Sequence, residues 1–94
     1  MPQGNAIYWL RTEHLGESQQ AFGRRFGLGQ SSISDAENGV PSRDLALAIF
    51  DRYGRALGAR GFSLLDLLTG RRRRWRARQG SDAAEASSLQ GDPA

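Results

Sequence analysis

The sequence predicts an all-α fold, a compact five-helix bundle followed by a flexible C-terminal tail. Between residues 6 and 70, apolar residues recur at the three- and four-residue spacing of helices, and no stretch alternates with the two-residue period of a strand. Residues 79–94 are rich in Ser, Ala, Gly and acidic residues and have too few apolar side chains to form a core. Residues 1–5 show no periodicity. We therefore expect a loose N-terminal arm over residues 1–5, one helical domain over residues 6–70, and a disordered acidic tail over residues 79–94.

Each expected helix has a start or stop signal of its own. Serine is a favourable N-cap residue, and it precedes three of the expected helices, at Ser18, Ser42 and Ser63. Glycine commonly follows a helix end, as Gly16 and Gly70 do here. The five helices are expected at residues 6–15, 19–26, 30–38, 43 to between 54 and 57, and 64–69.

The positive charge is concentrated in one block. All 13 basic side chains are arginine. Residues 1–70 contain seven arginines and seven acidic residues, whereas residues 71–78 contain six arginines and no acid. Guanidinium groups bind phosphate well, so this arginine-rich extension is a candidate DNA-phosphate surface, in which we place Arg71, Arg72, Arg73 and Arg74. Two other interpretations remain open: GC-rich codon use enriches arginine generally, and a charge run is often simply solvated.

Several classes of protein are excluded by what the sequence lacks. It contains no cysteine and one histidine, His14, so we expect no disulfide framework and no metal site. We find no nucleophile–base pair and no Gly-rich phosphate cradle, and therefore expect a protein that is not an enzyme and uses no cofactor. No apolar run approaches the ~20 residues of a membrane span, and residues 1–10 lack the pattern of a signal peptide. These features predict a cytoplasmic protein without a membrane partner.

Residues 19–39 have the spacing that a helix-turn-helix requires. The two helices of such a motif cross closely, and Gly23 supplies a small residue at the crossing. The turn needs a residue that accepts a positive φ, and Gly27 follows four positions later. Apolar side chains must fill the angle between the helices, and they are present at Phe22, Phe26, Leu28, Ile33 and Ala36. One glycine alone would mean little, but the whole set in one register predicts a helix-turn-helix.

The segment over residues 18–39, SQQAFGRRFGLGQSSISDAENG, resembles the helix-turn-helix of the lambdoid phage repressor and Cro group, also called the XRE family. The resemblance extends, with less specific matches, over about residues 6–70. It implies a five-helix, lambda-repressor-like domain that binds operator DNA, usually as a homodimer. The chain departs from the family pattern at Glu17 and Asp35, and residues 55–62 look like an insertion.

The resemblance implies which residues read bases. In the family, the N-terminal end of the helix over residues 30–38 meets base edges in the major groove. This assigns base reading to Gln30, Ser31, Ser32 and Asp35. The amide of Gln30 suits adenine. Asp35 either accepts a hydrogen bond from cytosine or is a surface charge that repels phosphate, and the sequence leaves both interpretations open.

Other residues are implied in phosphate contacts and in packing. Gln19, Asn38 and Arg43 would contact the DNA backbone. The family often pairs an arginine of the first helix with a glutamate near the end of the third, and here these are Arg11 and Glu37. Breaking such an ion pair would be costly if it is buried.

We therefore expect a sequence-specific, double-stranded DNA-binding transcriptional regulator, in particular a nucleoid-associated repressor that reads the major groove with residues 30–38. Its last expected helix and the residue just before the cap are unusually apolar, which indicates core packing, a homodimer surface, or both, at Phe62, Leu64, Leu65, Leu67 and Leu68. The alternative is a protein-interaction module, such as the antitoxin of a toxin–antitoxin pair, whose tail over residues 79–94 folds on a protein partner.

Overall fold

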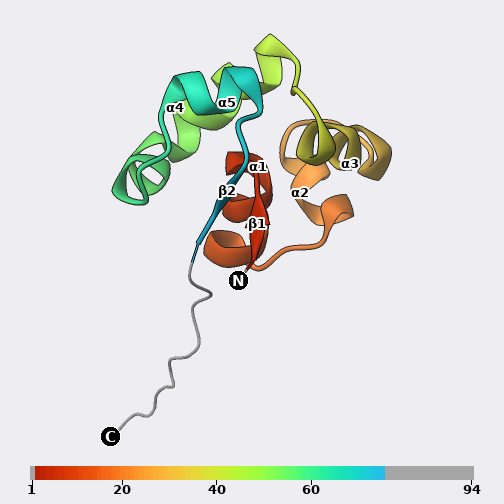
Figure 1. Cartoon of the computed structure of the whole chain (residues 1–94). Coiled ribbons are helices and arrows are strands. Elements are labelled where there is room, and N and C mark those ends of the chain that lie inside the picture. Colours follow the sequence, from red (N-terminus) through yellow and green to blue (C-terminus); the bar gives the residue numbers. More distant parts are fainter. Residues whose placement is uncertain (1, 76–94) are drawn as a thin grey trace, which may run out of the picture.

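The computed structural model describes residues 2–75 and is mostly helical, with five α-helices in this part of the chain (Figure 1). Along the sequence the elements are β1 (Gln3–Gly4), α1 (Ala6–Trp9), the π-helix η1 (Leu10–Leu15), α2 (Gln19–Arg25), α3 (Gln30–Asn38), α4 (Arg43–Ala59), α5 (Leu64–Thr69) and β2 (Arg73–Arg74). The expected number of helices is confirmed. The acidic tail over residues 79–94 and the end of the arginine-rich extension lie outside the described residues.

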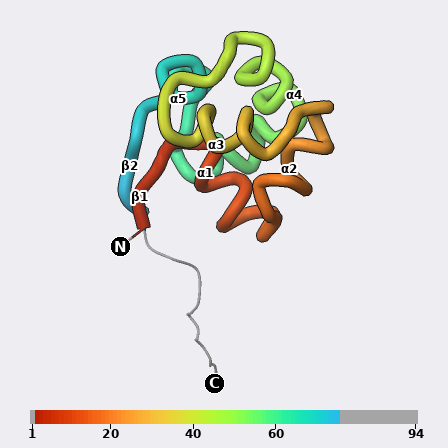
Figure 2. Tube along the Cα trace, turned by 90° about the vertical axis from the view of Figure 1, so that its right-hand side faces the viewer, coloured from red at the N-terminus to blue at the C-terminus, as the bar shows by residue number. Residues whose placement is uncertain are grey.

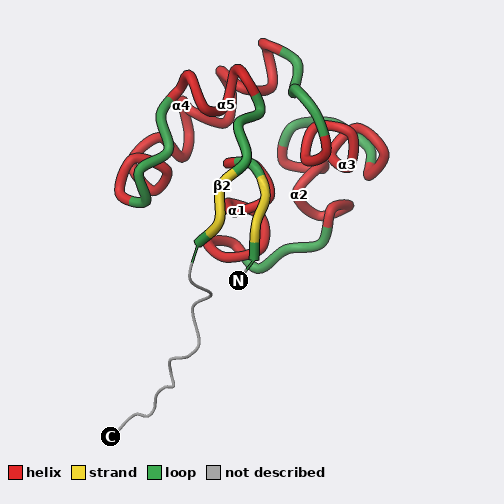
Figure 3. The backbone as a smooth tube through the Cα atoms, viewed as in Figure 1, coloured by secondary structure: helices red, strands yellow, loops and turns green. Residues whose placement is uncertain are grey.

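The described part of the chain begins with a paired segment instead of a loose arm. β1 pairs with β2 in an antiparallel register that places Gln3 opposite Arg74 (Figure 3). The Trp75 amide then donates to the Pro2 carbonyl at 3.1 Å. The predictions of a loose arm over residues 1–5 and of a chain without strands are therefore wrong for the described residues. A strand of two residues is too short to show an alternating pattern in the sequence. The two strands also lie at opposite ends of the described chain, so no local signal links them.

The first helix changes its winding halfway. One continuous helix was expected over residues 6–15, but α1 gives way to η1 after Trp9. Asn5 is the N-cap of α1, and its side chain accepts from the Tyr8 amide at 3.1 Å. The Asn5 amide group also donates to the Ala36 carbonyl at 2.7 Å, and the residue is fully buried. Asn5 thus ties the start of α1 to α3.

The fourth helix is longer than the sequence indicated. It was expected to end between residues 54 and 57, but α4 continues to Ala59. The helix bends at Tyr53, whose φ of −121° and ψ of 16° are not helical. Residues 55–59 of the expected insertion therefore extend α4, and Leu57 is fully buried in the core.

Side-chain caps fix three helix starts as the sequence predicts. Ser18 and Ser42 accept hydrogen bonds from the amides of the third residue beyond them. Ser63 and Asp66 form a reciprocal capping box at the start of α5. The Ser63 backbone N–H, with a smaller contribution from Arg71, holds the pKa of the Asp66 carboxyl below its usual range.

A single hydrophobic core joins all the helices. The β1–β2 pair lies against α1, and the five α-helices wrap around the same centre (Figure 2). Phe62 and Leu67 belong to this core, whereas Leu65 is 66% exposed. The apolar last helix therefore contributes to both the core and the surface. The buried hydrophobic residues are Ala6, Ile7, Trp9, Leu10, Phe22, Ile33, Ala36, Leu45, Ala46, Ile49, Leu57, Phe62, Leu67 and Trp75.

Candidate nucleic-acid interface

α2 and α3 pack side by side and are joined by a tight turn (Figures 1 and 2). Gly27 lies in this turn with a φ of +69°, which a residue with a side chain adopts only at a cost. The Leu28 amide donates to the Gly23 carbonyl at 2.9 Å and closes the turn. The rings of Phe22 and Phe26 lie 5.3 Å apart beneath it. The local geometry is that of two short helices held at a compact turn.

Gly23 of α2 lies close against the turn that leads to α3 and leaves no room there for a side chain. A Cβ atom at this position would lie 2.5 Å from the Leu28 carbonyl oxygen and 3.2 Å from Cγ1 of Ile33. The nearer atom belongs to the backbone and cannot move without opening the turn. Position 23 therefore requires glycine, because there is no space for a Cβ atom.

We expect Gly23→Ala to lower the free energy of unfolding by about 2 kcal/mol, the typical cost of overpacking. Gly58 in α4 is the matched control, because it is also helical and has no atom within 4 Å of an added Cβ. Gly58→Ala should instead raise stability by about 0.5 kcal/mol through helix propensity. Urea unfolding measures both, and changes of the same sign would contradict the close approach at Gly23.

The outer face of α3 carries the polar side chains expected to read bases. Gln30, Ser31, Ser32 and Asp35 are all exposed. The structure links Gln30 to α2, because its Nε2 donates to Oε1 of Gln19 at 3.3 Å. Asp35 and Ser32 line a shallow depression of about 280 Å³, bordered by Val40 and Leu45. The four residues share one face, but only Gln30 is held by another side chain in this way.

A polar network runs from the interior to Gln30. Glu37, only 4% exposed, forms an ion pair with Arg11, whose Nη2 lies 3.1 Å from Glu37 Oε1. The same carboxylate oxygen accepts from Nε2 of Gln19 at 3.0 Å. Arg11 also donates to the Glu17 carbonyl at 2.8 Å. The buried carboxylate thereby orients Gln19, and Gln19 orients Gln30.

Glu17, which departs from the family pattern, is used in a surface ion pair. Its carboxylate accepts from Nε of Arg25 at 2.8 Å. The hydrogen bonds from Arg25 hold the pKa of the Glu17 carboxyl below its usual range. Arg25 reaches Tyr53 of α4 as well, at 3.3 Å. A charged residue at position 17 therefore fits because it fastens the end of α2 and does not enter the core.

The four arginines of the arginine-rich extension that were expected at phosphates have different surroundings. Arg71 lies 3.4 Å from the Asp66 carboxylate, and Arg74 donates to Oε1 of Gln3 at 3.3 Å. Arg72 donates to the Glu37 carbonyl at 3.3 Å, close to the end of α3. Arg72 and Arg74 are exposed and carry no ion pair among the described residues.

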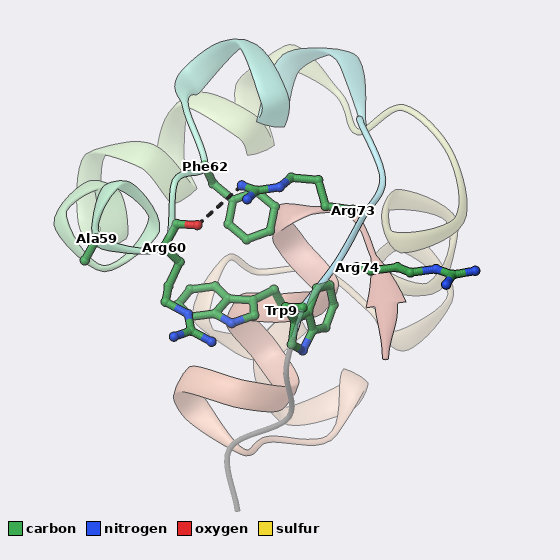
Figure 4. A pocket seen from close by; sticks show the side chains of 7 residues that line it. Trp9, Ala59, Arg60, Phe62, Arg73 and Arg74 are labelled. Carbon is green, nitrogen blue, oxygen red and sulfur yellow. Dashed lines mark hydrogen bonds between the residues drawn. The ribbon is translucent and has the colours of Figure 1, made fainter. Parts of the chain in front are cut away.

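Arg73 faces the protein. Its Nη1 donates to the Gly61 carbonyl at 2.8 Å and to the Arg60 carbonyl at 3.3 Å. Its guanidinium lies 4.7 Å from the centre of the Phe62 ring, in a crevice that Trp9 also lines, while Arg74 points away (Figure 4). This arrangement satisfies carbonyls at the end of α4 and does not support a phosphate contact by Arg73.

The remaining expected phosphate contacts lie on the surface. Arg43 is exposed at the first position of α4. Asn38 is exposed at the end of α3, where its side chain donates to the Ser34 carbonyl at 2.8 Å. Exposed apolar side chains occur at Val40, Leu47 and Leu65, which are 69%, 41% and 66% exposed.

Two polar residues near this face, Gln3 and Tyr8, were not singled out from the sequence. Both line a crevice with Gln19 and Arg72. No local pattern marks them, because only the β1–β2 pairing brings the two ends of the described chain together. Asn5 was detectable, since asparagine directly before an apolar helix is a common N-cap.

Over residues 2–75, no group of three side chains is arranged to hold a metal ion. None of the helices described here is both long and apolar enough to cross a membrane. Neither a family model, nor a curated protein, nor a solved structure matches the chain.

Proposed function

We propose that the protein is a sequence-specific regulator that binds double-stranded DNA, in particular a repressor of the XRE type, and reads the major groove with α3. The observation that carries this proposal is the held position of Gln30. Gln30 is exposed at the first position of α3. Its side chain donates a hydrogen bond to Gln19, and Gln19 in turn donates to the buried carboxylate of Glu37. A reading side chain that is oriented before binding loses less conformational entropy on contact with a base edge.

The composition of α3 fits a helix that chooses bases. Its N-terminal turn presents Gln30, Ser31 and Ser32, which are neutral hydrogen-bonding side chains. The helix N-terminus also carries a partial positive charge. The motif itself has little net charge, so phosphate contacts must come from its surroundings, where Arg43, Arg72 and Arg74 are exposed. In this division of roles, α3 supplies base choice and the surrounding arginines supply affinity.

A homodimer fits the exposed apolar side chains of the last two helices. Leu47 of α4 and Leu65 of α5 are both at least 41% exposed. Two-fold pairing would place two copies of α3 in successive major grooves, with half-sites about 34 Å apart. Sedimentation at increasing protein concentration, with and without Leu65→Gln, tests this association.

We expect Gln30→Ala to weaken binding to a selected DNA site by about 1–3 kcal/mol, because one bidentate base contact is lost. Binding to random duplexes should barely change. Gln20→Ala is the matched control, since Gln20 is an exposed glutamine on α2. The site is first selected from a random duplex pool, and fluorescence anisotropy then gives both affinities. Equal losses on selected and random DNA would exclude base reading by Gln30.

A further inference from the structure

We infer that a polar crevice beside α3 is a seat for one phosphodiester of the DNA backbone, and that the β1–β2 pair and Tyr8 complete it. This inference rests on the proposed DNA-binding function. It adds two residues to the DNA surface, Gln3 and Tyr8. It also separates Arg72 from its three arginine neighbours, because Arg72 alone of the four lines the crevice with α3.

The crevice has a volume of about 310 Å³ and is built from both ends of the described chain. Gln19, which lines it, also holds Gln30. A phosphate in the crevice would therefore fix the protein on the DNA backbone directly beside the reading residue, as register-setting contacts do. The lining residues are Gln3, Tyr8, Arg11, Gln19, Glu37, Asn38 and Arg72.

The charge of the lining matches one phosphodiester. Arg11 and Glu37 form an ion pair and neutralise each other. Arg72 donates to a neutral carbonyl and has no ion pair among the described residues, so it leaves one surplus positive charge. The other four lining side chains are neutral. A phosphodiester carries one negative charge, and guanidinium groups bind phosphate through charge-assisted hydrogen bonds.

The neutral side chains keep hydrogen-bond donors for an anion. A side-chain amide has two N–H groups, and Gln19 and Asn38 each use one on a protein acceptor. Gln3 accepts from Arg74 through its oxygen, which leaves its NH₂ group for other partners. Arg72 has five N–H donors, of which one meets the Glu37 carbonyl.

Tyr8 is held in place from three sides. The backbone of Gly4 in β1 packs on its ring so closely that an added Cβ would lie 2.6 Å from Cδ2. The Arg11 guanidinium lies 5.5 Å from the ring centre, and the Trp75 ring lies 6.0 Å away. The β1–β2 pair and the residues next to it therefore fix a phenol at the wall of the crevice. Its hydroxyl can donate to a phosphate oxygen.

The test compares two adjacent arginines in the full-length chain. Arg72→Gln and Arg71→Gln each remove one charge, but only Arg72 lines the crevice. We expect Arg72→Gln to weaken binding to selected and random duplexes alike, by about tenfold, as loss of a charge-assisted hydrogen bond does. The slope of log affinity against log salt should become shallower by about 0.9. Arg71→Gln should change affinity less than twofold.

Tyr8→Phe provides a second variant that leaves charge and packing unchanged. We expect it to weaken binding about threefold without changing the salt slope, because only a neutral donor is lost. Thermal unfolding confirms that each variant is folded. The phosphodiester seat would be excluded if Arg71→Gln and Arg72→Gln weakened DNA binding equally and Tyr8→Phe left the affinity unchanged. Those results would indicate that the arginines attract DNA only through their summed charge.

Two further outcomes distinguish failure of the phosphodiester seat from failure of the proposed DNA-binding function. If the unmodified chain enriches no sequence and binds no duplex, the proposed function itself fails. If inorganic phosphate binds the chain, Arg72→Gln abolishes that binding, and saturating phosphate displaces no more DNA than chloride does at equal ionic strength, the crevice is a site for free phosphate. That result would overturn a backbone seat while leaving DNA binding by α3 intact.

Discussion

Replacing Gly70 by alanine is expected to lower the free energy of unfolding by about 3 kcal/mol. Gly70 has a φ of +69°, where a side chain costs about 1–2 kcal/mol. An added Cβ would also collide with the Gly39 carbonyl oxygen and lie 3.2 Å from its carbon. That carbonyl belongs to the turn between α3 and α4, so relief of the collision requires movement of the backbone.

Gly27→Ala separates these two causes. Gly27 has the same φ of +69°, but an added Cβ there meets no atom within 4 Å. It should therefore cost only the conformational part, about 1 kcal/mol. Urea unfolding of both variants gives the difference. Equal losses would show that the end of α5 is not packed tightly against the turn after α3.

Replacing Glu37 by glutamine is expected to cost about 3 kcal/mol of stability, because it leaves Arg11 without its counter-charge. Glu37 and Arg11 are only 4% and 13% exposed. Glu17→Gln is the matched control, since it breaks an ion pair whose arginine is 39% exposed. Exposed pairs contribute little, so the unfolding midpoint of Glu17→Gln should hardly move. Similar shifts for the two variants would exclude a stabilising buried pair.

Glu37→Gln should also affect discrimination between DNA sequences. Glu37 accepts from Gln19, which in turn holds Gln30. An amide at position 37 has one acceptor oxygen, for which Arg11 and Gln19 would compete, so Gln30 is less constrained and the ratio of specific to random binding should fall. This ratio is measured under conditions in which the variant remains folded. A ratio that stays unchanged would mean that Gln30 does not depend on the buried carboxylate.

Helix positions were largely predictable because their signals are local. Ser18, Ser42 and Ser63 cap the helices that follow them, and α3 spans the residues expected for it. The need for a small residue at Gly23 also follows from spacing alone. Each of these features depends on residues within a few positions of one another.

Features that depend on distant residues were not predictable. β1 and β2 are too short to show a strand pattern, and their pairing joins the two ends of the described chain. The extension of α4 past Gly54 depends on burial of Leu57 in the core, which overrides the helix-breaking tendency of glycine. The inward position of Arg73 depends on the carbonyls of Arg60 and Gly61.

The β1–β2 pairing also has a consequence for the order in which the molecule is completed during translation. Gln3 is synthesised 71 positions before its partner Arg74. A nascent chain that has reached Gly70 already contains all of α2 and α3, yet it lacks Arg72 and the strand that holds β1 in place. A prematurely terminated product of this length would therefore retain α3 without the arginine that lines the crevice beside it. The two can be joined only after residues 71–75 have been synthesised.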